Sequence, residues 1–156
     1  MRQLAGLLVT LVVCYGAAAL GGLLTSSSVG TWYQTLHKPP FSPPNWVFGP
    51  VWTALYGTMA VAAWLVWRSA GAGQAKLPLL LFAVQLCLNV AWSGLFFGLR
   101  QPGWAVLEIC VLWVAIGASL VSFLRVSPLA GWLMAPYLLW VSFAAILNLS
   151  LWLLNR

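Results

Sequence analysis

Five long apolar stretches dominate the chain, separated by short segments that contain prolines and polar residues. Each stretch is long enough to cross roughly 30 Å of hydrocarbon as a helix. Backbone groups must pair within their own segment in lipid, and the ten-residue alternation of a β-barrel is absent. The pattern therefore predicts an all-α integral membrane protein, a five-transmembrane-helix bundle, with spans at about 4–24, 46–67, 78–98, 103–124 and 129–153.

The boundaries of these spans are marked by proline and arginine. Pro78, Pro102 and Pro128 lie at span starts, where a missing N–H costs nothing. An odd number of spans places the two termini on opposite sides of the membrane. Three of the connections are short, which favours antiparallel packing of consecutive helices. The basic residues divide too evenly between the two sides to give an orientation.

Composition and charge exclude the ordinary soluble classes. Of the 156 residues, 63% are hydrophobic and 5% are charged, whereas soluble domains have about 45–50% and 25%. The net charge of +6 comes from basic residues scattered singly, so no nucleic-acid partner is predicted. We expect one membrane domain over residues 1–156 in contact with the lipid bilayer, in a membrane that the sequence does not specify. The apolar run after Arg2, about 21 residues, is longer than a signal-peptide core and favours a retained span.

Groups that could carry metal or acid–base chemistry are sparse. The three cysteines are far apart, and no His/Cys/Asp/Glu cluster has the spacing of a metal site, so neither a metal nor a resident cofactor is predicted. Glu108 is the one acidic residue and lies inside the fourth span. An ionised acid near mid-membrane costs about 2.5–3.5 kcal/mol. We therefore expect Glu108 to face the bundle and to be either protonated or hydrogen-bonded.

The first connection, residues 25–45, differs from the others in length and content. It contains Trp32 and Tyr33 and then four prolines within six residues, which impose a stiff, extended backbone. Long connections in compact proteins are usually functional lids or disordered linkers. The aromatic and proline residues favour an ordered lid over one mouth of the bundle, with Trp32 or Tyr33 pointing inward.

Polar and aromatic residues recur at helical spacing in three of the spans, so those within one span share a face. One interpretation is interhelical hydrogen bonding, worth about 0.6 kcal/mol for each bond. The other is a slot for a flat apolar ligand, with Ala144 leaving room beside large rings. The candidate ligand-binding residues are Trp32, Tyr33, Trp52, Tyr56, Asn89, Trp92, Tyr137, Trp140, Ala144 and Asn148.

Small residues four apart allow close approach between helices. Gly94 and Gly98 form a GxxxG pair in the third span, and the first span contains weaker versions at Ala17/Gly21 and Ala18/Gly22. These pairs favour two alternatives equally: a homodimer through Gly94/Gly98 or the first span, and packing within one bundle.

Several motifs together resemble a known family. The first connection and second span read Trp32-Tyr33-x-x-Leu36-x-Lys38-Pro39-x-Phe41-x-Pro43-Pro44-x-Trp46-Val47-Phe48-x-x-Val51-Trp52, and Asn89-x-x-Trp92, Pro136-Tyr137-x-x-Trp140 and Leu147-Asn148 follow. With five spans, the chain resembles the TspO/MBR family over nearly its whole length. That family includes the tryptophan-rich sensory proteins of bacteria and the mitochondrial translocator protein.

The resemblance implies a five-helix bundle whose pocket opens toward the first connection and binds porphyrins such as protoporphyrin IX. By motif position, it assigns pocket roles to Tyr33, Trp52, Asn89, Trp92 and Trp140. Residues matching Trp52 and Trp140 are also implicated in light-driven porphyrin breakdown by bacterial members, which makes them the catalytic candidates if the protein is an enzyme.

Two departures from the family pattern affect the expected ligand. Phe41 stands where relatives often have Trp, which keeps stacking but removes an N–H donor. The sterol-recognition motif of animal members is broken, because residues 147–156 contain no Tyr.

Three functions remain open at this point. The first is a receptor or translocator-like protein that binds tetrapyrroles and regulates their transport or levels. The second is an enzyme that degrades porphyrin with light and oxygen. The third is a structural or signalling partner in the membrane.

Overall fold

The computed structural model of the chain describes residues 2–70 and 73–156, and in these residues all regular structure is helical. The elements are α1 (Arg2–Val29), α2 (Trp32–Thr35), a 3-10 turn η1 (Asn45–Val47), α3 (Phe48–Ser69), α4 (Lys76–Ser93), a π-helical turn η2 (Gly94–Gly98), α5 (Pro102–Val126) and α6 (Pro128–Leu154). Five helical segments, Gln3–Val29, Asn45–Ser69, Lys76–Gly98, Pro102–Val126 and Pro128–Leu154, are long and apolar enough to cross a membrane. The predicted all-α membrane bundle is confirmed.

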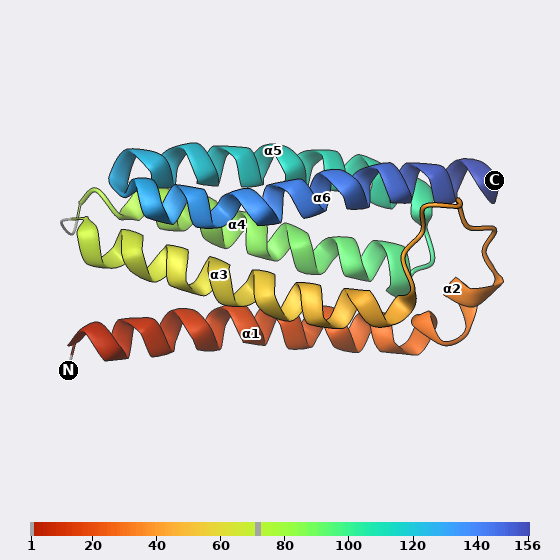
Figure 1. Cartoon of the computed structure of the whole chain (residues 1–156), viewed down its shortest axis with the longest axis horizontal. Coiled ribbons are helices and arrows are strands. Elements are labelled where there is room, and N and C mark those ends of the chain that lie inside the picture. The colour runs from red at the N-terminus through yellow and green to blue at the C-terminus, as the bar shows by residue number, and fades with distance from the viewer. Residues whose placement is uncertain (1, 71–72) are drawn as a thin grey trace.

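The five long helices lie nearly side by side, and the N- and C-termini are at opposite ends of the bundle (Figure 1). Helix α1 packs on α3 and α4, α3 packs on α6, and α5 packs on both α4 and α6. Consecutive long helices are therefore neighbours. The contact between α3 and α4 is smaller than the others, because α1 lies against both of them.

Helix ends largely follow the expected signals. Pro102 and Pro128 begin α5 and α6, and the Ser127 hydroxyl accepts a bond from the Ala130 N–H at 3.4 Å. Helix α1 continues five residues beyond the predicted end at 24 and reaches Val29. Within this extension, the hydroxyls of Thr25 and Ser26 donate to the carbonyls of Gly21 and Leu23 of the same helix, so they need no partner outside it.

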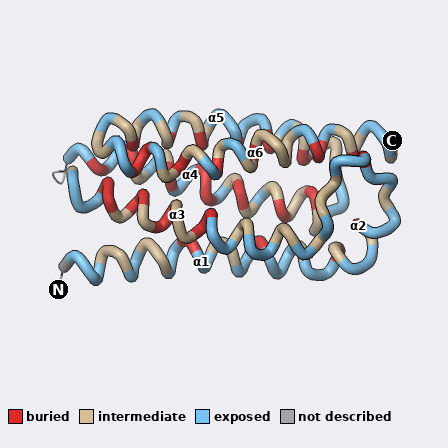
Figure 2. Tube along the Cα trace, viewed as in Figure 1, coloured by how far each residue is buried: buried red, intermediate tan, exposed pale blue. Residues whose placement is uncertain are grey.

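Burial follows the inward stripe of each helix, while α1 is exposed along most of its length (Figure 2). The core of the bundle includes Met59, Ile116 and Met134, each fully buried. Many large apolar side chains point outward, as expected where the surrounding solvent is lipid.

Glycines allow close helix contacts within this one chain. A Cβ built on Gly94 or Gly98 would lie 3.7 or 3.9 Å from Leu24 of α1. The GxxxG pair thus supports packing inside the bundle, the second of its two alternatives, and the homodimer stays a prediction.

The carboxylate oxygens of Glu108 are shielded, and neither has a hydrogen-bond partner among the described residues. The carboxyl group is therefore covered by protein, as expected for an acid at this depth. The hydrogen-bonded state expected for it is not formed with any described residue.

Candidate ligand-binding pocket

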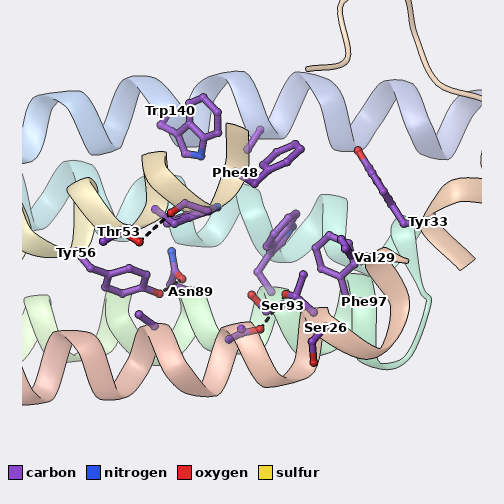
Figure 3. Close-up of a pocket in the computed structure, with 18 residues that line it drawn as sticks. Ser26, Val29, Tyr33, Phe48, Thr53, Tyr56, Asn89, Ser93, Phe97 and Trp140 are labelled. Atoms are coloured by element: carbon purple, nitrogen blue, oxygen red, sulfur yellow. Dashed lines mark hydrogen bonds between the residues drawn. The ribbon is translucent and has the colours of Figure 1, made fainter. Parts of the chain in front are cut away.

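A cavity of about 330 Å³ lies near the α2 end of the bundle, between α1, α3, α4 and α6 (Figure 3). Helix α1 contributes small residues to its wall, among them Ala18, Gly21 and Gly22, whereas α3 and α6 contribute aromatic rings. Concave, mostly apolar cavities of 300–1,000 Å³ are typical of sites for small molecules. Its position toward the first connection matches the pocket that the family resemblance implies.

Tyr33 of α2 reaches the pocket from the first connection and is 2% exposed. Its ring lies 6.2 Å from that of Phe96 and 5.7 Å from that of Phe97, and Lys38 Nζ lies 4.4 Å from its centroid. Burial raises the pKa of the Tyr33 phenol above its ordinary value, so the group is a neutral hydroxyl at physiological pH. Trp32 does not line the pocket; it packs against the edge of Phe96, with ring centroids 5.8 Å apart.

The floor of the pocket is a chain of buried hydrogen bonds. The Tyr56 hydroxyl donates to Asn89 Oδ1 at 2.6 Å, and Asn89 Nδ2 donates to the Tyr137 hydroxyl at 2.8 Å. That hydroxyl in turn donates to Gln85 Oε1 at 2.8 Å. Tyr56 and Asn89 face the cavity, while Tyr137 and Gln85 lie behind them, fully buried. The network joins α3, α4 and α6 and fixes the side chains that a ligand would meet.

Two tryptophans on different helices line the pocket. The Trp52 ring lies 5.8 Å from Tyr56 and 6.2 Å from Tyr137, and the Trp140 ring lies 6.0 Å from Phe48. Figure 3 shows Trp140 projecting from α6 toward Phe48. Its Nε1 is shielded and has no partner in the described part of the chain. This wall thus offers flat apolar surface to the cavity.

Trp92 and Asn148 hold the pocket together from the side of α4 and α6. Trp92 Nε1 donates to Asn148 Oδ1 at 3.0 Å, and Asn148 Nδ2 donates to the Pro102 carbonyl at 3.0 Å. Both amide groups of Asn148 are occupied in this way, and it lines only a smaller cavity of about 30 Å³ next to the pocket. Asn148 therefore positions Trp92 rather than facing the main cavity.

The structure brings most of the sequence-predicted site residues together. Seven of the ten line the pocket: Tyr33, Trp52, Tyr56, Asn89, Trp92, Trp140 and Ala144. Trp32, Tyr137 and Asn148 lie one layer behind. Sequence reasoning missed the α1 wall and also Phe48, Thr53, Ser93 and Phe97 as lining residues. The Ala18/Gly22 spacing was the available signal for α1, but it was interpreted only as helix packing.

The pocket is poor in groups that react. Among residues 2–70 and 73–156 no group of three or more His, Cys, Asp or Glu could hold a metal ion. Its lining carries no charged side chain. The arrangement suits shape and stacking recognition of an uncharged or weakly polar flat surface.

Fold and site define a multi-pass α-helical membrane protein with an aromatic pocket between its helices. The family model described as the TspO/MBR family matches residues 8–153, and the chain belongs to that family. It is 42% identical over 144 residues to the translocator protein of Sus scrofa, covering 88% of this chain and 85% of that protein.

Bacterial relatives match over similar lengths. The tryptophan-rich protein TspO of Chlorobaculum tepidum is 37% identical over 158 residues, covering 99% of this chain and 98% of the relative. The protein CrtK of Rhodobacter capsulatus is 39% identical over 145 residues, with 92% and 89% covered.

Proposed function

We propose that the pocket binds a porphyrin such as protoporphyrin IX, and that the protein acts as a receptor or translocator-like protein that regulates tetrapyrrole transport or levels. The single observation that carries this proposal is a cavity lined by Trp52, Trp92 and Trp140 with a fixed polar floor. Family membership supports the same ligand class.

The physical basis is stacking on rings that are already held in place. Neighbouring aromatic contacts and the Asn148 bond fix Trp52, Trp92 and Trp140 before a ligand arrives. Preorganised side chains lose little entropy on binding. A flat conjugated macrocycle offers a π-face to these rings, and its polar substituents would meet the floor formed by Tyr56 and Asn89.

The test is a titration of purified protein with protoporphyrin IX in the dark, followed by quenching of tryptophan fluorescence. Trp140→Ala should weaken binding by about 1–3 kcal/mol, by analogy with base–aromatic stacking. Trp132→Ala is the control, because Trp132 is 70% exposed on the same helix and does not line the pocket. Equal affinities for the two variants would contradict the assignment.

The first connection acts in this proposal as a lid over the pocket. Tyr33 supplies the inward contact, and Asn155 of the C-terminal segment exchanges two hydrogen bonds with the backbone of His37, at 2.9 and 3.0 Å. Bound porphyrin should protect the segment 35–42 from added protease. Unchanged cleavage at saturating ligand would count against a lid.

Light- and oxygen-dependent breakdown of bound porphyrin is the second candidate. It is favoured by the position of Trp52 and Trp140, two of the three oxidisable indoles in the wall of one cavity. The pigment would supply the photochemistry and the protein the orientation. The double variant Trp52→Phe/Trp140→Phe keeps aromatic surface but removes both indoles. Loss of light-driven bleaching with dark binding retained would support this activity, and wild-type bleaching would exclude these residues from it.

A further inference from the structure

The pocket is closed toward the end of the bundle that carries the lid. Asn155 bonds the lid backbone at His37 from one side, and Tyr33 packs on Phe96 and Phe97 from the other. Pro39 of the same connection is buried. A ligand coming from this end would have to break these contacts first.

The side of the pocket between α1 and α3 is different. Four of its lining residues are both small and exposed: Gly22 and Ser26 on α1, and Gly49 and Thr53 on α3. We call these four residues the window. A Cβ built on Gly22 or Gly49 would meet no other group within 4 Å, so open space adjoins both backbones. Both helices are membrane spans, so the window faces lipid.

The hydroxyl groups at the window do not obstruct an apolar molecule. Ser26 donates to the Leu23 carbonyl at 2.9 Å and Thr53 donates to the Gly49 carbonyl at 2.9 Å, each within its own helix. These donors are already satisfied, so lipid or a passing ligand leaves no unpaired hydroxyl hydrogen.

Hydrogen bonds of α1 lie on both sides of Gly22 and Ser26. Toward the N-terminus of α1, the Tyr15 hydroxyl donates to the Thr53 carbonyl at 3.1 Å, and Trp64 Nε1 donates to the Gln3 carbonyl at 3.0 Å. Toward the other end, the Ser28 hydroxyl donates to the Phe97 carbonyl at 2.7 Å and ties α1 to η2 instead of α3. The bonds between α1 and α3 thus lie on the N-terminal side of Gly22, and none of these bonds joins the two helices beyond Ser26.

We propose that the ligand enters and leaves the pocket sideways from the bilayer, through the window between α1 and α3. The inference rests on the proposed function and deepens it: the ligand class is a flat amphiphile that is dissolved in the membrane, not one captured from water. Its polar edge would meet the Asn89 and Tyr56 floor, and its apolar edge would remain against lipid at the window.

The test compares two glycines of α1 in protein reconstituted into phosphatidylcholine vesicles. Gly22→Phe places a ring in the window. Gly16→Phe is the matched control, because a Cβ at Gly16 also meets nothing within 4 Å and Gly16 does not line the pocket. Protoporphyrin IX is preloaded in protein-free vesicles, and stopped-flow quenching of tryptophan fluorescence gives association and dissociation rates.

If the ligand passes through the window, Gly22→Phe should slow both association and dissociation by at least tenfold, which corresponds to an increase on the order of 1.4 kcal/mol in each activation barrier. The two rates of Gly16→Phe should stay within twofold of the wild-type rates. Ser26→Phe, one turn along the same face, should act in the same direction. Slower association with faster dissociation would mean that Gly22 is only a wall of the pocket, and would overturn the proposal.

A second variant tests the competing route through the lid. Asn155→Leu removes both bonds to His37 and loosens the lid, and sideways entry predicts an unchanged association rate. Acceleration by Asn155→Leu would overturn the window. If quenching of the wild-type protein did not saturate, the proposed function itself would be refuted. If the wild-type protein bound saturably and Gly22→Phe had the same association and dissociation rates as Gly16→Phe, only the proposed entry through the window would be refuted.

Discussion

The two ends of the bundle are packed in contrasting ways. At the end away from the lid, the Phe82 and Phe123 rings stack at 5.6 Å, and a Cβ on Gly131 would lie 2.3 Å from Leu124 Cγ. At the lid end, α1, α3, α4 and α6 leave a cavity of about 330 Å³, and a Cβ on Gly22 meets nothing within 4 Å. Gly131 thus allows a close contact at one end, whereas Gly22 borders open space at the other.

The difference shows how a small membrane protein can keep a cavity without collapsing. Lipid provides no hydrophobic force that draws helices together, so packing and hydrogen bonds must hold them. The far end supplies the packing, and the lid end is held by specific bonds such as those of Asn89 and Ser28. The contrast makes graded predictions about stability.

The largest loss of stability should come from filling the tight end. Gly131→Val forces a side chain into Leu124 and its backbone N, which lies 2.9 Å from a Cβ at this site. We expect destabilisation of about 1–3 kcal/mol from overpacking. Thermal unfolding in detergent, followed by circular dichroism, measures it, with Gly22→Val as the matched substitution. Equal unfolding temperatures for the two variants would contradict the proposed difference in packing between the two ends of the bundle.

Breaking the hydrogen bonds in the floor of the pocket should lower the free energy of unfolding by a comparable or smaller amount. Asn89→Leu leaves the hydroxyls of Tyr56 and Tyr137 without their Asn89 partner, for a loss of about 1–3 kcal/mol. The same unfolding assay applies, with Tyr56→Phe as the milder control because it removes a single bond. If Asn89→Leu were as stable as wild type, the network would not fix the floor.

Replacing Glu108 by an apolar residue should increase the stability of the protein. Its carboxylate oxygens are shielded without a partner in the described structure, so Glu108→Leu should stabilise the protein, by roughly 1 kcal/mol, since an unpaired buried polar group is costly. Glu108→Gln keeps the polarity and should show no such gain. Destabilisation by Glu108→Leu in the unfolding assay would show that the carboxyl group has a stabilising contact.

The smallest effect should come from the lipid-facing surface. Trp113 is 43% exposed in the middle of α5, and its Nε1 donates to the Ser142 hydroxyl at 2.8 Å. Trp113→Phe should cost about 0.6 kcal/mol, the typical value for one interhelical bond in a membrane. A loss as large as that of Asn89→Leu would mean that exposed and buried bonds are equivalent here.

Hydropathy alone predicted the five spans, because lipid forces long apolar segments to be helices. It placed the end of α1 too early, since Thr25 and Ser26 look like loop residues until their hydroxyls bond back to the helix. The chain order of the helices did not show that α1 lies against both α3 and α4 and reduces the contact between them.

The aromatic part of the site was accessible from spacing, but its depth was not. Tyr137 and Asn148 share a helical face with Trp140, yet Tyr137 lies behind Asn89, and Asn148 is occupied by Trp92 and Pro102. Helical periodicity shows which residues share a face of a helix, but it does not show which of them line a cavity and which lie behind the lining residues. The α1 wall carried only the Ala18/Gly22 spacing as a signal, and such a stripe of small residues looks the same whether it borders a helix or an empty space.

An experimental structure of the protein with protoporphyrin IX bound in the dark would test the proposed site directly. We expect the macrocycle between Trp52 and Trp140, beneath Tyr33, with one edge at the window formed by Gly22, Ser26, Gly49 and Thr53. A macrocycle seated instead in the shallow groove beside Trp104 and Trp152, at the ends of α5 and α6, would contradict this expectation.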